Sequence, residues 1–157
     1  KLISGAFERV LYARIAEAVR EGRSVWHQLV NFVLSVEVVA VVVALLLWFF
    51  AEPLFSICFG DRWAGCGEYV RALLPWAVAA VGSQPLMFVP NIFGTQRTEF
   101  FIYLVQLALR IGSITLGIIK GDFLLAVRLF AAVSAMTSLV LLVWYMMQIV
   151  RHEREVR

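Results

Sequence analysis

The chain has 157 residues and a formal net charge of +3; 62% of its residues are hydrophobic and only 16% are charged. A soluble globular domain carries about 25% charged and about 45–50% apolar residues, so this composition cannot cover a folded surface with water-facing side chains. It therefore excludes an ordinary soluble domain and indicates an integral membrane protein.

The N-terminal segment, residues 1–28, alternates apolar and charged residues at helical spacing. Leu11, Ile15 and Val19 can share one face of an amphipathic helix. We expect a cytoplasmic helix that either extends a preceding transmembrane span or lies on the membrane, and we favour the first because residues 2–7 look like the end of a span. The segment begins without Met and shows no signal-peptide pattern. We therefore expect this chain to be part of a longer protein.

Long apolar runs with few ionisable groups fill the next part of the chain, at residues 31–51, 69–89, 99–119 and 123–150. About 20 helical residues cross a hydrocarbon core of ~30 Å, so each run is long enough to span a bilayer. The runs lack strict two-residue alternation, which favours helices over a β-barrel. The predicted fold is an all-α integral membrane protein with four transmembrane helices in residues 29–150, followed by a basic tail at 151–157.

The distribution of basic residues predicts the orientation. Nine basic residues lie before the first run, in the connection after the second, or in the tail, and three (Arg62, Arg71 and Lys120) lie in or at the edge of the other two connections. Cytoplasmic loops carry an excess of Lys and Arg. Both ends of this chain are therefore expected in the cytoplasm, and the connection between the first two runs outside.

That external connection is a polar, glycine-bearing stretch. Pro53 follows Glu52 and is expected to weaken or end the first helix, because proline lacks an amide donor and restricts the preceding residue. Gly60 can adopt turn conformations that other residues avoid. Asp61 is expected to cap a short helix beginning near Trp63. The sequence thus predicts a chain reversal at the outer surface.

The third run carries an ionisable residue, Arg110, well inside the membrane, and such residues are functional candidates. Polar and small residues recur every three or four positions around it and form one stripe, which consists of Tyr103, Gln106, Arg110, Ser113 and Gly117. This stripe is expected to face protein or water rather than lipid. Arg110 is then either a ligand-binding group, a hydrogen-bonded packing residue, or the partner of a carboxylate outside this chain.

Arg128 lies in the fourth run, which is antiparallel to the third. A turn centred on Lys120-Gly121 would place the guanidinium groups of Arg110 and Arg128 at similar depth. Two cations at one depth favour an anionic ligand, because arginine binds phosphate through a rigid fork of donors and stays protonated. The alternative for Arg128 is that its side chain reaches the outer headgroups.

The first and second runs hold further candidates. Glu37, about 9 Å into its run, can reach the cytoplasmic face, pair with an arginine, or join a proton or cation path. Pro75, Pro85 and Pro90 lie in or just after the second run and are either static kinks or hinges for alternating access. Gln84 lies among them and is a candidate for contact with a polar ligand.

Several chemistries find no support in the sequence. There is no glycine-rich phosphate loop, and neither His27 nor His152 begins a metal-ligand pattern. No arrangement favours nucleophilic or acid–base catalysis, so we expect no enzyme activity, no cofactor and no nucleic-acid partner. The two cysteines, Cys58 and Cys66, either form a disulfide or remain thiols.

Short motifs occur in a recognisable order along the chain, at Phe59-Gly60, Trp63, Pro85-Leu86, Asn91, Gly94 and Arg97. Their order and spacing resemble those of the C-terminal half of polysaccharide flippases, which belong to the multidrug/oligosaccharidyl-lipid/polysaccharide exporter superfamily. The stretch "VLYARIAEAVREG" resembles the cytoplasmic segment after the eighth helix of that family. Ala13 departs from the family pattern, which has proline there. The resemblance covers nearly the whole chain.

This resemblance implies helices nine to twelve of a twelve-helix, two-lobe transporter in the bacterial inner membrane. The implied activity is translocation of lipid-linked oligosaccharide or polysaccharide precursors, such as those of lipopolysaccharide, by alternating access against an N-terminal lobe that is absent here. Arg110, Arg128, Gln106 and Gln84 would contact the polyprenyl pyrophosphate headgroup, and Glu37 would be the candidate for ion coupling. The alternatives are a multidrug exporter of the same superfamily and a small non-transporting membrane scaffold or subunit.

Overall fold

The computed structural model describes Glu17 and residues 26–156. The regular elements of this part of the chain are helices: α2 (Trp26–Phe59), η1 (Asp61–Trp63), α3 (Cys66–Ser83), η2 (Gln84–Leu86), α4 (Val89–Phe93), α5 (Gln96–Ile119) and α6 (Phe123–Val156). The helix expected at residues 1–28 lies outside the described residues, except for Glu17 and for the last three positions, which belong to α2.

The described residues contain four helical stretches that are long and apolar enough to cross a membrane, at Leu29–Phe59, Cys66–Phe93, Gln96–Ile119 and Phe123–His152. The prediction of four spans in an all-α fold is confirmed. The long helices begin or end outside the predicted runs, except that α3 ends at Ser83, inside the run predicted at 69–89. The residues expected to form a basic tail after position 150 continue α6 as far as Val156.

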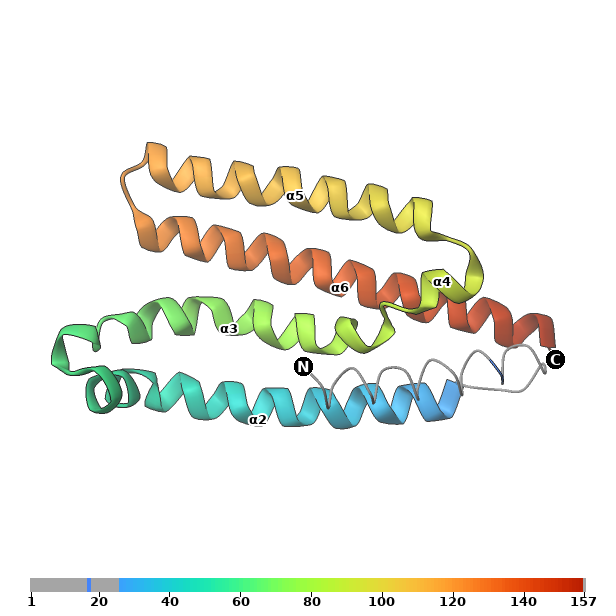
Figure 1. The fold of residues 1–157 in the computed structure, drawn as a ribbon, viewed down its shortest axis with the longest axis horizontal. Coiled ribbons are helices and arrows are strands. Elements are labelled where there is room, and N and C mark those ends of the chain that lie inside the picture. The colour runs from blue at the N-terminus through green and yellow to red at the C-terminus, as the bar shows by residue number, and fades with distance from the viewer. Residues whose placement is uncertain (1–16, 18–25, 157) are drawn as a thin grey trace.

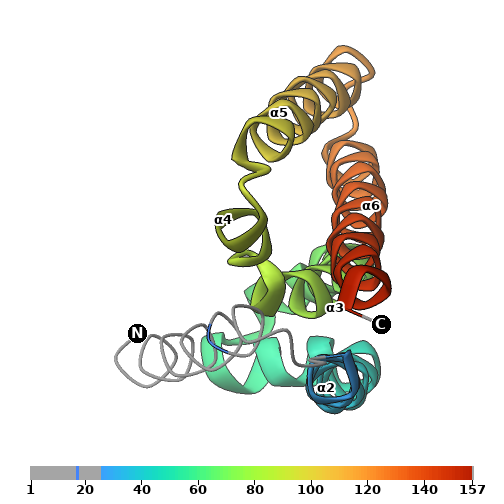
Figure 2. The ribbon, with the colours of Figure 1, turned by 90° about the vertical axis from the view of Figure 1, so that its right-hand side faces the viewer.

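Consecutive long helices run antiparallel, and their order in space is α2, α3, α6, α5 (Figures 1 and 2). Helices α3 and α6 pack against each other in the middle, while α2 packs on α3 and α5 packs on α6. The α2–α3 connection and the α5–α6 turn lie at one end of the bundle (Figure 1). The start of α2, α4 and the end of α6 lie at the opposite end, so both ends of the described chain lie at the same end of the bundle.

Helix α2 continues through Pro53 as far as Phe59, and its last turns point away from the direction of its first part (Figure 2). The proline removes one backbone donor and bends the helix without ending it. The expected cap is wrong: Asp61 begins η1 and accepts a hydrogen bond from the Ser56 hydroxyl, and α3 begins only at Cys66 with no side-chain cap. Gly60 makes the turn between the two helices with a φ of 89°.

The second span is discontinuous. Helix α3 contains Pro75 without a break but ends at Ser83, after which η2 and the short α4 complete the crossing. Pro85 lies in η2 and Pro90 in the first turn of α4, where each lacks the donor that a continuous helix would need. The prolines therefore divide the span near the end of the bundle that holds α4.

The main buried cluster lies at this same end, and it joins α2, the broken segment and α6. Its fully or nearly buried members are Leu29, Val33, Leu86, Phe88, Val89, Leu141, Tyr145 and Ile149. Elsewhere the long helices expose large apolar side chains, such as Val38 on α2 and Phe100 on α5. Such surfaces suit lipid or further helices as their surroundings.

Candidate functional site

Arg110 lies in the middle of α5 and reaches toward both central helices. Its Cζ is 5.5 Å from the ring centroid of Trp76 on α3 and 5.3 Å from that of Phe130 on α6. Its Nε donates a hydrogen bond of 2.8 Å to the hydroxyl of Ser134. The two rings also contact each other edge to face, with centroids 5.5 Å apart. We call this group (Arg110, Trp76, Phe130 and Ser134) the Arg110 cage.

The electrostatics of the Arg110 cage are unusual for a cation inside a membrane span. Each cation–π contact contributes about 0.5–2 kcal/mol, depending on desolvation. The ion pairs of the described chain are Glu52–Arg71 and Glu68–Arg128, so no described carboxylate forms a salt bridge with Arg110. Among the described residues the guanidinium is held by uncharged groups, so no described carboxylate neutralises its positive charge.

The stripe predicted on α5 faces α6, as expected. Gln106, Ser113 and Gly117 are buried, while most α5 residues between them are exposed. A Cβ atom at Gly117 would lie 2.2 Å from the Cβ of Ala126, so the two backbones approach each other closely there. This contact sets the register that brings Arg110 to Ser134.

Arg128 does not share the position of Arg110. Gly117 opposes Ala126, so Arg110 is level with residues near Ser134, and Arg128 lies about 9 Å of helical rise from Ser134 toward the turn. The prediction that the two guanidinium groups lie at similar depth is therefore wrong. The reason is that the turn includes Asp122, whose carboxylate accepts a hydrogen bond from the Leu125 amide, so fewer helical residues separate Arg128 from the turn.

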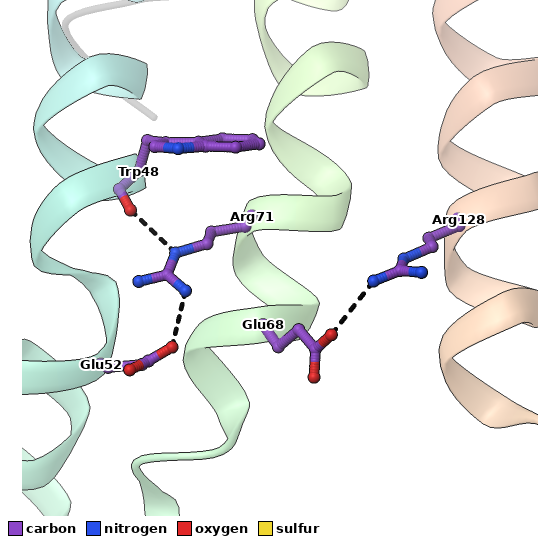
Figure 3. A network of polar contacts seen from close by, with 5 residues as sticks. All are labelled: Trp48, Glu52, Glu68, Arg71 and Arg128. Carbon is purple, nitrogen blue, oxygen red and sulfur yellow. Dashed lines mark hydrogen bonds and ion pairs between the residues drawn. The ribbon is translucent and has the colours of Figure 1, made fainter.

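Arg128 instead belongs to a set of polar contacts near the η1 end of the bundle, shown in Figure 3. Its Nη2 lies 3.0 Å from Oε1 of Glu68 on α3, with the two side chains 60% and 54% exposed. One turn along α3, Arg71 pairs with Glu52 of α2 at 2.6 Å and donates to the Trp48 carbonyl at 2.8 Å. These contacts join α2, α3 and α6.

These partners were not predicted from the sequence. The predicted runs left Glu52 and Glu68 in the external connection and placed Arg71 at the edge of the second run, whereas the structure includes all three in long helices. Gly67 allows the pairing, because a Cβ there would lie 2.8 Å from the Glu52 backbone nitrogen. An acid and a base separated by 19 or 60 positions give no local signal in the sequence.

The other predicted site residues are dispersed. Gln84 is exposed in η2, away from the buried stripe that contains Gln106. Glu37 lies on α2, and its Oε2 would be 2.7 Å from a Cβ at Gly82 of α3, so the missing side chain of that glycine leaves room for the carboxyl group. The Glu37 Oε2 is buried and has no hydrogen-bond partner among the described residues. Cys58 and Cys66 are free thiols.

A second polar cluster, also missed, lies between α4, α5 and α6 at the other end of the bundle. The fully buried Tyr145 donates a hydrogen bond of 2.6 Å to Glu99, and Thr95 donates one of 2.7 Å to Gln148. These contacts anchor the start of α5 on α6. Tyr145 and Gln148 are three positions apart and therefore lie on one face of α6. This spacing was the only signal in the sequence that could have predicted the cluster.

No protein-family model, curated protein or solved structure matches this chain. The chain is thus defined by its own geometry: four helices fit to cross a membrane, one discontinuous crossing, and an arginine held at mid-span by aromatic rings and a hydroxyl.

Proposed function

We propose that this chain is part of a bacterial inner-membrane flippase that translocates lipid-linked oligosaccharide or polysaccharide precursors. The observation that carries the proposal is the Arg110 cage. A guanidinium in a transmembrane span is costly, and it stays charged because arginine cannot lose its proton at physiological pH. Here it has uncharged partners, so a polyprenyl pyrophosphate headgroup would supply the counter-charge.

Substrate contact requires movement at this site. Trp76 and Phe130 cover the guanidinium in this conformation, so an incoming headgroup must displace at least one ring. The ring of Trp76 on α3 and the ring of Phe130 on α6 can separate when the α2–α3 pair moves relative to the α5–α6 pair. The division of the second span at η2 supports such movement, because discontinuous helices are common at the binding sites of transporters that alternate their access.

The residues proposed to contact the headgroup are fewer than the sequence suggested. Gln106 is buried one turn from Arg110 on the same helix face and remains in the proposed site. Arg128 is neutralised by Glu68, so its proposed role is to join α3 to α6. Gln84 lies outside the buried stripe and is removed from the proposal.

A multidrug exporter of organic cations is the second candidate, and one observation favours it. The Glu37 carboxyl group has a buried oxygen without a described hydrogen-bond partner, and a carboxylate is the group that an organic cation would seek. A non-transporting scaffold is the third candidate and predicts that neither Arg110 nor Glu37 affects ligand binding.

A binding experiment separates these candidates. The protein would be purified in detergent, and binding of polyprenyl pyrophosphate and of a lipophilic cation would be measured for the parent and the Arg110→Gln, Arg110→Lys and Glu37→Gln variants. Arg97→Gln is the control, because Arg97 is an exposed residue near the start of the same helix. Loss of a charge-assisted contact worth about 1.5–3 kcal/mol weakens binding by about 10- to 150-fold.

The flippase proposal predicts that Arg110→Gln loses pyrophosphate binding, that Arg110→Lys retains part of it and that Arg97→Gln is unchanged. Cation binding lost in Glu37→Gln would favour the exporter, and no ligand binding by any variant would favour the scaffold. In the cell, Arg110→Ala in the full-length protein should abolish surface polysaccharide at an unchanged protein level. Normal polysaccharide in that strain would remove Arg110 from the mechanism.

A further inference from the structure

A groove lies between the first part of α2 and the last part of α6, on a different helix pair from the Arg110 cage. Its volume is about 590 Å³, and its walls are mainly apolar, with Val33 and Leu34 from α2 and Val143, Met146 and Met147 from α6. A space with mainly apolar walls suits a hydrocarbon chain. In a membrane, lipid chains would lie against these walls.

Charged residues lie at the two ends of this groove. Arg151 and Arg154 line it near the end of α6, and their spacing of three residues places them on one helix face. Glu37 lines its inner end, at the level of Leu142, since both residues approach the same point beside Gly82. The charge therefore changes from positive at the helix end to acidic toward the middle of the bundle.

The length of the groove matches one leaflet of a membrane. The helical rise from Leu142 to Arg154 is about 18 Å, and half of a ~30 Å hydrocarbon core is about 15 Å. A chain that follows the apolar walls from the arginines would thus end near Glu37. A polar headgroup at the arginine end would lie at the membrane surface, on the side that the distribution of basic residues predicts to be cytoplasmic.

We propose that this α2–α6 groove is a binding site for an anionic membrane phospholipid, with one acyl chain along the apolar walls and the phosphate at Arg151 and Arg154. Charge complementarity selects this occupant. The two guanidinium groups attract the phosphate by charge-assisted hydrogen bonds, and the acid at the inner end orients the anionic headgroup away from it. A zwitterionic lipid has the same chains but brings a cationic group to the two arginines.

The site is independent of the flippase proposal, because none of its lining residues belongs to the Arg110 cage. Bound lipid would bridge α2 and α6, which have few direct contacts with each other, and would thereby stabilise the arrangement in which both pack on α3. The chemical class of ligand is a glycerophospholipid with net negative charge.

Native mass spectrometry of the purified protein tests the headgroup part of the proposal. The probes are phosphatidylglycerol and phosphatidylcholine with identical acyl chains, added at equal concentration. We expect phosphatidylglycerol to be retained at least about tenfold better, and the double variant Arg151→Gln/Arg154→Gln to lose this preference. The exposed Arg97 provides the matched control, because Arg97→Gln removes a charge from the same end of the bundle outside the groove. Arg110→Gln should also leave the preference unchanged.

A second pair of variants tests the groove itself. Met147→Trp would fill the groove, whereas Met136→Trp places the same ring on the exposed face of α6 outside it. Only Met147→Trp should reduce retention of phosphatidylglycerol. If the arginine variant fails to fold by circular dichroism, Arg151→Lys/Arg154→Lys keeps both charges and should retain the lipid preference.

Four outcomes would overturn the proposal. Equal retention of the two lipids would show only the general lipid layer around the protein. An unchanged preference in the double Gln variant, or an equal loss in the Arg97 control, would remove the arginines as the headgroup contact. A protein dimer that dissociates on Met147→Trp, without any lipid preference, would assign the groove to a second copy of the chain.

Discussion

Replacing Gly117 by alanine perturbs the contact that sets the register of α5 on α6. The new Cβ would lie 2.2 Å from the Cβ and 2.4 Å from the Cα of Ala126, whereas carbon atoms in contact lie about 3.5–4.0 Å apart. The obstacle includes the backbone of α6, which cannot rotate aside as a side chain can. The two helices must therefore separate by more than about 1 Å at this point.

Gly112 is a matched control on the same helix, because a Cβ there would meet no atom within 4 Å. Both substitutions gain about 1 kcal/mol of helix propensity, which cancels when the two variants are compared. Overpacking costs about 1–3 kcal/mol. We therefore expect the free energy of unfolding of Gly117→Ala to be lower than that of Gly112→Ala by about 1–3 kcal/mol.

The assay is thermal unfolding in detergent, followed by far-UV circular dichroism. For a chain of this size, about 1 kcal/mol corresponds to about 2–4 °C in Tm, so the two variants should differ by several degrees. Separation of α5 from α6 also moves Arg110 away from Ser134, so Gly117→Ala should bind polyprenyl pyrophosphate less tightly than Gly112→Ala does. Equal Tm values for the two variants would refute the close approach of α5 to α6 at Ala126.

Two further predictions concern polar contacts. Tyr145→Phe leaves the Glu99 carboxylate without its buried donor and should lower the free energy of unfolding by about 1–3 kcal/mol. The control Tyr69→Phe, at a more exposed position, should change the free energy of unfolding little. Equal effects of the two variants in thermal unfolding would contradict this prediction. For the ion pair of Arg128 and Glu68, a double-mutant cycle with Arg128→Gln and Glu68→Gln should give a coupling energy below about 1 kcal/mol, because both side chains are more than half exposed. A larger coupling energy would show that the pair is shielded from water.

The spans could be predicted from the sequence because they depend on local properties. About 20 consecutive apolar residues satisfy their own backbone hydrogen bonds as a helix, whatever the rest of the chain does. The stripe through Gln106 and Gly117 was likewise predicted, because a helix repeats every 3.6 residues and the membrane excludes polar groups from its lipid-facing side. Helix ends were less well predicted: Pro53 marks a bend in α2 rather than its end.

Charge partners could not be predicted in the same way. The sequence left Arg110 and Arg128 as two cations without acids, since Glu68 lies 60 positions from Arg128 and was assigned to a connection. A difference of one or two residues in the α5–α6 turn changes the level of Arg128 by several ångströms. Predictions that depend on exact register therefore failed, while those that depend on periodicity were confirmed.

The sequence alone thus determined that this is a helical membrane protein, where the four membrane-length stretches of the described residues lie, and which face of α5 avoids lipid, because composition and periodicity act within each segment. Only the tertiary structure decided that Arg110 meets Trp76, Phe130 and Ser134 while Arg128 meets Glu68. Those contacts depend on the packing of α3 and α5 against α6. That packing follows from close approaches such as Gly117 to Ala126, between residues whose proximity no single segment specifies.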